Sequence, residues 1–283
     1  MKKVKIAGVP EHFNMPWEMC IESGEFEQIG IDLQWTDVPE GTGKMCQMLR
    51  DGEADMAVIL TEGIVKDIVA GNRCKIVQVY VDSPLIWGIH VASGSNFKNL
   101  SDLENTRVAI SRLGSGSQLM AFVNAHNQNW NIKNLKFEIV NTIDGAVEAL
   151  TKGTADYFMW ERFMTKPLVD RGIFRRIADC PTPWPCFVIA IRNDVLAKHP
   201  EIISKILKII NLKTQSFKKI EGIDALIAQK YHQKVEDIRE WLSITEWSQN
   251  LPDAIMLNKV QNQLIELGII IKKGTFAQIV KAI

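Results

Sequence analysis

Two short turns rich in glycine and hydroxyl residues are the parts of this chain best suited to hold a ligand. Gly41-Thr42-Gly43 and Gly114-Ser115-Gly116-Ser117 each precede a segment with helical periodicity. Glycine turns at helix starts present unpaired main-chain N–H groups and a partial positive charge, which favour an anion. We therefore expect both turns to bind the anionic end of a small molecule, with simple helix capping as the open alternative.

Ionisable side chains follow the first apolar segment and two later ones. The Glu11-His12-Phe13 run could recognise a polar ligand group or carry a proton, although a histidine in such a place is also a common structural residue. Thr61-Glu62 and Glu161 close two further apolar segments. Their carboxylates could bind a ligand amine or cap the next helix.

Three larger side chains complete the candidate binding residues. Arg112 lies just before the second glycine turn and could pair with a carboxylate or phosphate, or form a surface salt bridge. Trp160 and Trp184 could form an aromatic wall for the body of a ligand, the alternative being burial in the core.

Charge and motif content exclude several classes of function. Lys plus Arg and Asp plus Glu are 33 each, so the formal net charge is zero and a nucleic-acid partner is not expected. The chain has no Walker loop, GxGxxG, GxSxG, HExxH or zinc-type Cys/His spacing, and we expect no cofactor and no metal. No apolar run is long enough for direct membrane insertion.

The five cysteines contain no CxxC pair, and no signal peptide follows Met1. These features favour reduced thiols and a cytoplasmic location, or a periplasmic one only where a signal peptide has been removed.

Short apolar strands alternate with helical segments through the first two thirds of the chain, as in parallel α/β layers. Strands are expected at residues 4–9, 32–37, 56–60, 76–81, 107–111, 136–140, 157–160 and 186–191. Helices are expected near residues 16–24, from Thr42 or Gly43 to Gly52, at 116–127 and 143–152, and from 199 to the end. A second α/β unit begins after Ser93-Gly94-Ser95-Asn96.

A short sequence pattern occurs twice in the chain and supports two similar units; we call this repeat the internal echo. Residues 48–57 and 149–158 both place a helix end, a glycine, Ala-Asp and then a strand, with the glycines at Gly52 and Gly153 and the acids at Asp55 and Asp156. A polar turn with a glutamate follows each copy, at the carboxyl edge where open α/β sheets bind ligands.

On these residues the chain resembles the type 2 periplasmic binding protein superfamily, in its nitrate, sulfonate and thiamine-precursor branch of ABC transporter substrate-binding proteins. The resemblance rests on the two glycine-to-aspartate turns, the Asn99-Leu100-Ser101-Asp102-Leu103 lead into the 107–109 strand, and the turn at 114–117. Residues 8–14 and 160–167 resemble a smaller subgroup without signal peptides, found also in fungi.

The resemblance implies two Rossmann-like α/β lobes joined by two crossover strands, with C-terminal helices. Lobe 1 would comprise residues 1–90 plus 190–283 and lobe 2 residues 91–189, with a ligand cleft between them. The two crossing strands would lie near residues 89–92 and 188–191. The expected function is capture of a small anionic metabolite by hinge closure, with an ABC transporter membrane component as an open further partner.

The open alternative is a cytosolic enzyme on the same fold, acting on a metabolite such as a thiamine- or menaquinone-pathway intermediate. In that case His12 with Glu11 or Glu62 would supply acid-base chemistry. A ligand-sensing regulator is the third and weakest interpretation.

Overall fold

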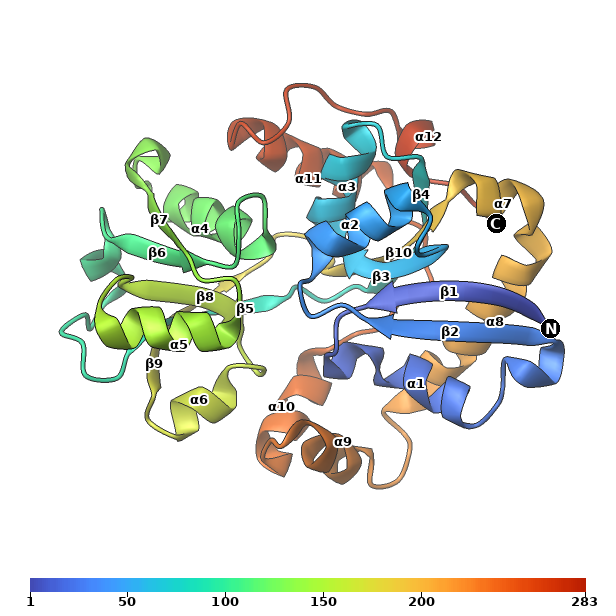
Figure 1. Ribbon diagram of the computed structural model, residues 1–283, viewed down its shortest axis with the longest axis horizontal. Coiled ribbons are helices and arrows are strands. Elements are labelled where there is room, and N and C mark those ends of the chain that lie inside the picture. The colour runs from blue at the N-terminus through green and yellow to red at the C-terminus, as the bar shows by residue number, and fades with distance from the viewer. The chain divides into compact units, whose positions relative to one another are not determined.

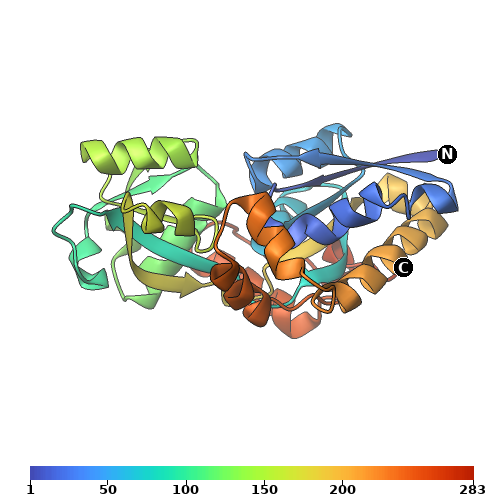
Figure 2. The same ribbon diagram turned by 90° about the horizontal axis from the view of Figure 1, so that it is seen from below.

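A computed structural model describes the whole chain, residues 1–283. The chain forms two compact units. The first comprises Met1–Ser83 and Trp184–Ile283, and the second comprises Pro84–Pro183. The second unit is one continuous run of colour, whereas the first combines blue N-terminal with orange and red C-terminal segments, so both chain ends lie in the first unit (Figures 1 and 2).

The first unit contains a five-stranded mixed sheet with the order β2-β1-β3-β10-β4. Its strands are β1 Lys2–Gly8, β2 Ile31–Asp37, β3 Met56–Leu60, β4 Cys74–Val81 and β10 Phe187–Arg192. β1, β2 and β3 are parallel, and β10 runs antiparallel to both β3 and β4. The entirely apolar β3 sequence suits this central position, because both faces of the strand are covered.

Three helices follow the parallel strands of the first unit, and six more follow β10. They are α1 Met15–Glu22, α2 Thr42–Asp51 and α3 Thr61–Val69, then α7 Asn193–Lys198, α8 Pro200–Phe217, α9 Ile223–Tyr231, α10 Val235–Ile244, α11 Ala254–Glu266 and α12 Phe276–Ile279. Right-handed crossovers from β1 to β2 and back to β3 place α1 and α2 on opposite faces of the sheet. In keeping with this, α1 packs on α8, while α2 and α11 pack on α3. No helix in either unit is long and apolar enough to cross a membrane.

The second unit repeats the plan with the sheet order β7-β6-β8-β5-β9. Its strands are β5 Ile86–Ala92, β6 Arg107–Ile110, β7 Lys136–Ile139, β8 Tyr157–Glu161 and β9 Phe174–Pro181. Its helices are α4 Gly116–Asn127, α5 Ile143–Lys152 and α6 Lys166–Asp170. β6, β7 and β8 are parallel, and β5 is antiparallel to β8 and β9.

The echoed aspartates perform the same structural task in the two units. The Asp55 carboxylate accepts a hydrogen bond from the Lys5 main-chain N–H at 2.9 Å, and the Asp156 carboxylate accepts one from the Arg107 N–H at 2.7 Å. The main-chain N–H of each aspartate donates in return to the carbonyl of the same partner, at 2.9 and 2.8 Å. Each echo thus fixes the register of two neighbouring parallel strands.

The chain crosses between the units at Ser83-Pro84 and at Pro183-Trp184. Both crossings come earlier in the chain than the boundaries at residues 90 and 189 that were predicted from the sequence. The apolar runs near Ile89 and Val188, expected to be the crossing strands, lie inside sheets as β5 and β10. An apolar strand pattern does not specify which sheet receives it. The sequence interpretation also missed β9, whose polar residues break the apolar run.

We predict that Asp55→Ala lowers the free energy of unfolding by about 1–2 kcal/mol, because the Lys5 N–H loses a charged acceptor. Chemical denaturation measures the effect. The exposed Asp51→Ala on the same turn is the control and should change stability by less than about 0.5 kcal/mol. Equal effects for the two variants would contradict the role assigned to Asp55.

Candidate functional site

Most of the candidate residues gather at the carboxyl edge of one sheet or the other. In the first unit, Glu11-His12-Phe13 follows β1, Thr42 follows β2, and Thr61-Glu62 directly follows β3. In the second unit, the 112–117 turn follows β6 and Glu161 ends β8. This edge is where parallel α/β sheets carry their ligand sites.

The start of α2 has polar groups without partners. Gly41 caps the helix at φ +78°, in the left-handed region that favours glycine, and its carbonyl accepts from Lys44 and Met45 at 3.1 and 3.2 Å. The N–H groups of Thr42 and Gly43 have no hydrogen-bond partner in the chain. The Thr42 hydroxyl is also buried without a partner. The α2 start therefore offers three donors to a ligand.

Close packing against α3 orients Thr42. A Cβ atom added at Gly63 would lie 2.2 Å from Thr42 Cγ2, so only glycine leaves room for that methyl group. Packing of its methyl group against Gly63 therefore orients the Thr42 side chain. The hydroxyl group makes no hydrogen bond within the chain.

His12 lies in an aromatic cluster and is fully buried. Its ring centroid is 4.2 Å from that of Trp241, 5.1 Å from Phe13 and 5.6 Å from Tyr231. Burial lowers the pKa of His12 to about 3, so the imidazole is neutral. Neither ring nitrogen has a hydrogen-bond partner, and neither do the Tyr231 hydroxyl and the Trp241 indole nitrogen. The cluster thus combines apolar rings with four unused polar atoms.

The sequence interpretation missed Tyr231 and Trp241. They lie on α9 and α10, far from His12 along the chain, and the available signal was only an apolar helical pattern. Phe13 packs in the core of the first unit: its ring lies against Phe187, and its carbonyl accepts a hydrogen bond from the Tyr80 hydroxyl at 2.9 Å.

Thr61 and Glu62 bind the chain segment that enters the first unit. The Trp184 indole N–H donates to Glu62 Oε2 at 2.8 Å, and the Thr61 hydroxyl donates to the Pro185 carbonyl at 2.6 Å. Glu62 and Trp184 are buried, and Glu62 Oε1 has no partner. The structure therefore brings together two candidates, Glu62 and Trp184, that the sequence did not pair.

Two carboxyl groups at this edge have shifted pKa values. Burial raises the pKa of Glu62 to about 7, against smaller opposing effects of hydrogen bonds, including the one from Trp184, and of Lys66. Burial likewise raises the pKa of the neighbouring candidate Glu11 to about 7. At neutral pH both groups are present in large part as neutral acids, which can donate a hydrogen bond.

A serine cluster occupies the start of α4 in the second unit. Ser115 caps the helix by accepting from the Gln118 N–H at 3.3 Å, and its hydroxyl lies 3.0 Å from that of Ser117. Ser117 Oγ also accepts from the Ser111 N–H at 2.9 Å. The N–H groups of Gly116 and Ser117 have no partner in the chain. The start of α4 therefore has both a side-chain cap, from Ser115, and main-chain N–H donors without a partner.

The remaining candidates of the second unit have mixed surroundings. Trp160 is half-buried and stacks on Phe158 with ring centroids 5.4 Å apart. The buried Glu161 carboxylate accepts from the Met164 N–H at 2.7 Å in the turn before α6, whereas the N-cap of α6 is Thr165, so Glu161 does not cap the next helix. Arg112 is half-buried, and its carbonyl accepts from the Ser115 N–H at 3.2 Å. Ligand contacts of all three stay predictions.

Metal-ligating residues do not cluster. No group of three or more His, Cys, Asp or Glu side chains has the spacing to hold a metal ion. All five cysteines are free and buried.

Comparisons with known proteins agree with this architecture. Residues 87–180 match the family model described as Ca3427-like PBP. No curated protein matches the chain by sequence. The conserved CA3427 gene product of Candida albicans, which exhibits the generic periplasmic binding protein fold, is 25% identical with a TM-score of 0.90, over 99% of this chain and 96% of that one.

The chain has the periplasmic binding protein fold. This confirms the expected two α/β units with C-terminal helices and the predicted resemblance. The alkanesulfonate-binding protein SsuA of Xanthomonas axonopodis pv. citri shares this fold at 14% identity and a TM-score of 0.85, over 100% of this chain and 99% of that one. The Escherichia coli aliphatic sulphonate binding protein SsuA shares it at 16% identity and a TM-score of 0.75, over 99% and 92% of the two chains.

We predict that Glu62→Gln reduces the dependence of stability on pH. A carboxyl whose pKa rises from 4.5 to about 7 on folding stabilises the fold fully below pH 4.5. That contribution is lost as the pH rises through about 7. Relative to wild type, the variant should therefore gain about 2–3 kcal/mol in unfolding free energy between about pH 5 and pH 8.

Denaturant unfolding at several pH values measures this difference. The exposed Glu40→Gln is the matched control and should follow wild type at every pH. A difference between Glu62→Gln and wild type that does not change with pH would contradict the neutral state assigned to Glu62.

Proposed function

We propose that the protein is a solute-binding protein that captures a small anionic molecule in a cleft between its two units by hinge closure. The observation that carries the proposal is the pair of helix starts, α2 and α4, whose first N–H groups have no partner in the chain. An oxyanion or carboxylate can accept from several such donors at once.

The neighbouring acids are compatible with an anionic ligand. Ionised carboxylates would repel it, but Glu11 and Glu62 have pKa values of about 7 and are available in neutral, donating form. Affinity for an anion should therefore increase as the pH falls below 7, because more of each acid is protonated.

The structural relatives support the ligand class. The SsuA structure from Xanthomonas axonopodis pv. citri is that of an alkanesulfonate-binding protein bound to MOPS. A sulfonate presents three oxygens that suit the free N–H groups, and an organic body could lie against an aromatic ring such as Trp160.

Capture is favoured over catalysis because of the state of His12. The acid-base alternative paired His12 with Glu11 or Glu62, and full burial lowers the pKa of His12 to about 3, so the imidazole of that pair does not take up a proton near pH 7. A neutral imidazole enclosed by aromatic rings suits binding, not proton transfer at pH 7.

We predict that Thr42→Val weakens anion binding about tenfold without lowering stability. Valine keeps the methyl contact with Gly63 but removes the hydroxyl that has no partner in the chain. Isothermal titration with MOPS, ethanesulfonate, succinate and inorganic phosphate identifies the tightest probe and compares the two proteins.

The exposed Thr151→Val, on α5, controls for the substitution itself and should bind like wild type. Unchanged affinity in Thr42→Val for the tightest probe, or no binding of any of these anions to wild type, would contradict the proposal.

A further inference from the structure

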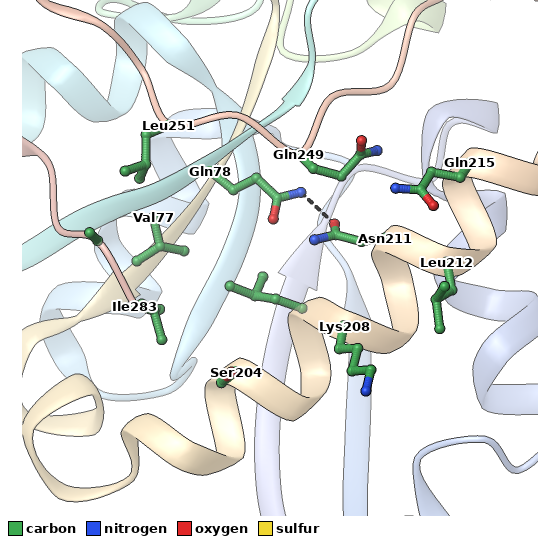
Figure 3. A pocket seen from close by; sticks show the side chains of 12 residues that line it. Val77, Gln78, Ser204, Lys208, Asn211, Leu212, Gln215, Gln249, Leu251 and Ile283 are labelled. Carbon is green, nitrogen blue, oxygen red and sulfur yellow. Dashed lines mark hydrogen bonds between the residues drawn. The ribbon is translucent and has the colours of Figure 1, made fainter.

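A hollow of about 440 Å³ lies on the first unit, between β4, α8 and the chain's last residues. Val77 and Gln78 of β4, Leu207 and Asn211 of α8, and Leu251 line it, and Figure 3 shows their polar neighbours Gln215 and Gln249 at one side. None of these residues belongs to the candidate site described above.

Incomplete cover of an edge strand creates this hollow. β4 is the last strand of its sheet, and residues 246–250 cover one part of its free edge, with Val79 N–H donating to the Asn250 carbonyl at 2.8 Å. The C-terminal segment covers the other part, where Lys281 N–H donates to the Ile76 carbonyl at 3.0 Å. Val77 and Gln78 lie between the two covering segments, at the floor of the hollow.

Hydrogen bonds determine which amide atoms of Gln78 and Asn211 remain free to face the hollow. Gln78 is 3% exposed, and its Nε2 donates to the Ser248 carbonyl at 3.0 Å and to Asn211 Oδ1 at 2.7 Å. A carbonyl needs a donor, so Nε2 must face Ser248, and Oδ1 of Asn211 must then accept. Both Gln78 Nε2 hydrogens are used.

The other two amide atoms are unused. Gln78 Oε1 and Asn211 Nδ2 make no hydrogen bond within the chain. Figure 3 shows both on the same side of the Gln78–Asn211 bond, turned away from the Gln249 side chain. The hollow therefore presents one acceptor and one donor side by side.

We propose that this hollow is a second ligand site, for a small neutral molecule with a carboxamide or lactam edge. The N–H of such an edge would donate to Gln78 Oε1, and its C=O would accept from Asn211 Nδ2. Apolar atoms of the ligand would lie on Val77, Leu207 and Leu251. An anion does not match the pair, because the Gln78 oxygen would repel it. Lys208 also lines the hollow, but its ammonium group points away from Gln78 and Asn211 (Figure 3).

Titration with 2-pyrrolidinone tests the proposal, followed through the Gln78 and Asn211 side-chain amide resonances in ¹⁵N-labelled full-length protein. These resonances should shift and saturate together. N-methyl-2-pyrrolidinone lacks the N–H and should bind about tenfold more weakly. Asn211→Asp keeps an acceptor for Gln78 but lacks the donor and should weaken 2-pyrrolidinone binding by a similar factor.

Asn258→Asp, an exposed substitution on α11, is the matched control and should bind like wild type. The proposal is overturned if no shift occurs at up to about 0.1 M 2-pyrrolidinone. It is equally overturned if the N-methyl compound binds as well, or if Asn211→Asp binds like wild type, because the hollow would then lack amide recognition. Anion binding at the other site does not enter any of these readouts.

Discussion

Main-chain N–H groups at the starts of helices must find acceptors, and the rest of the candidate site depends on this constraint. In each unit, parallel strands bring their carboxyl ends to one edge, and the next helix begins there. α2 and α4 satisfy part of the requirement internally, through Gly41 and through the Ser115 cap. The Thr42, Gly43, Gly116 and Ser117 donors are left for another molecule.

Groups with pKa values shifted toward the neutral form complement these donors. Glu11, Glu62 and His12 would each carry a charge at some ordinary pH in water, but burial shifts all three pKa values toward the uncharged form. The first unit can therefore enclose polar groups near its sheet edge without isolated charges. The hydrogen bond from Trp184 to Glu62 also ties this edge to the segment where the chain returns from the second unit.

Local sequence patterns predicted the parts of the fold that local chemistry specifies. The Gly52-to-Asp55 and Gly153-to-Asp156 echoes located equivalent strand starts, because each aspartate completes a bond that its own unit needs. The α4 and α5 bounds followed from glycine turns and caps. Features made by distant segments could not be predicted: the rings of Tyr231 and Trp241 around His12, the pairing of Glu62 with Trp184, and the sheet that receives β5 or β10.

Amide hydrogen exchange, followed by NMR with and without the tightest-binding anion, tests the central claim most directly. The account predicts that the Thr42 and Gly43 amides and the Gly116 and Ser117 amides become protected together, at the same ligand concentration and with one molecule bound per chain. Protection of only one helix start, or of neither, with the anion bound would contradict capture by both units.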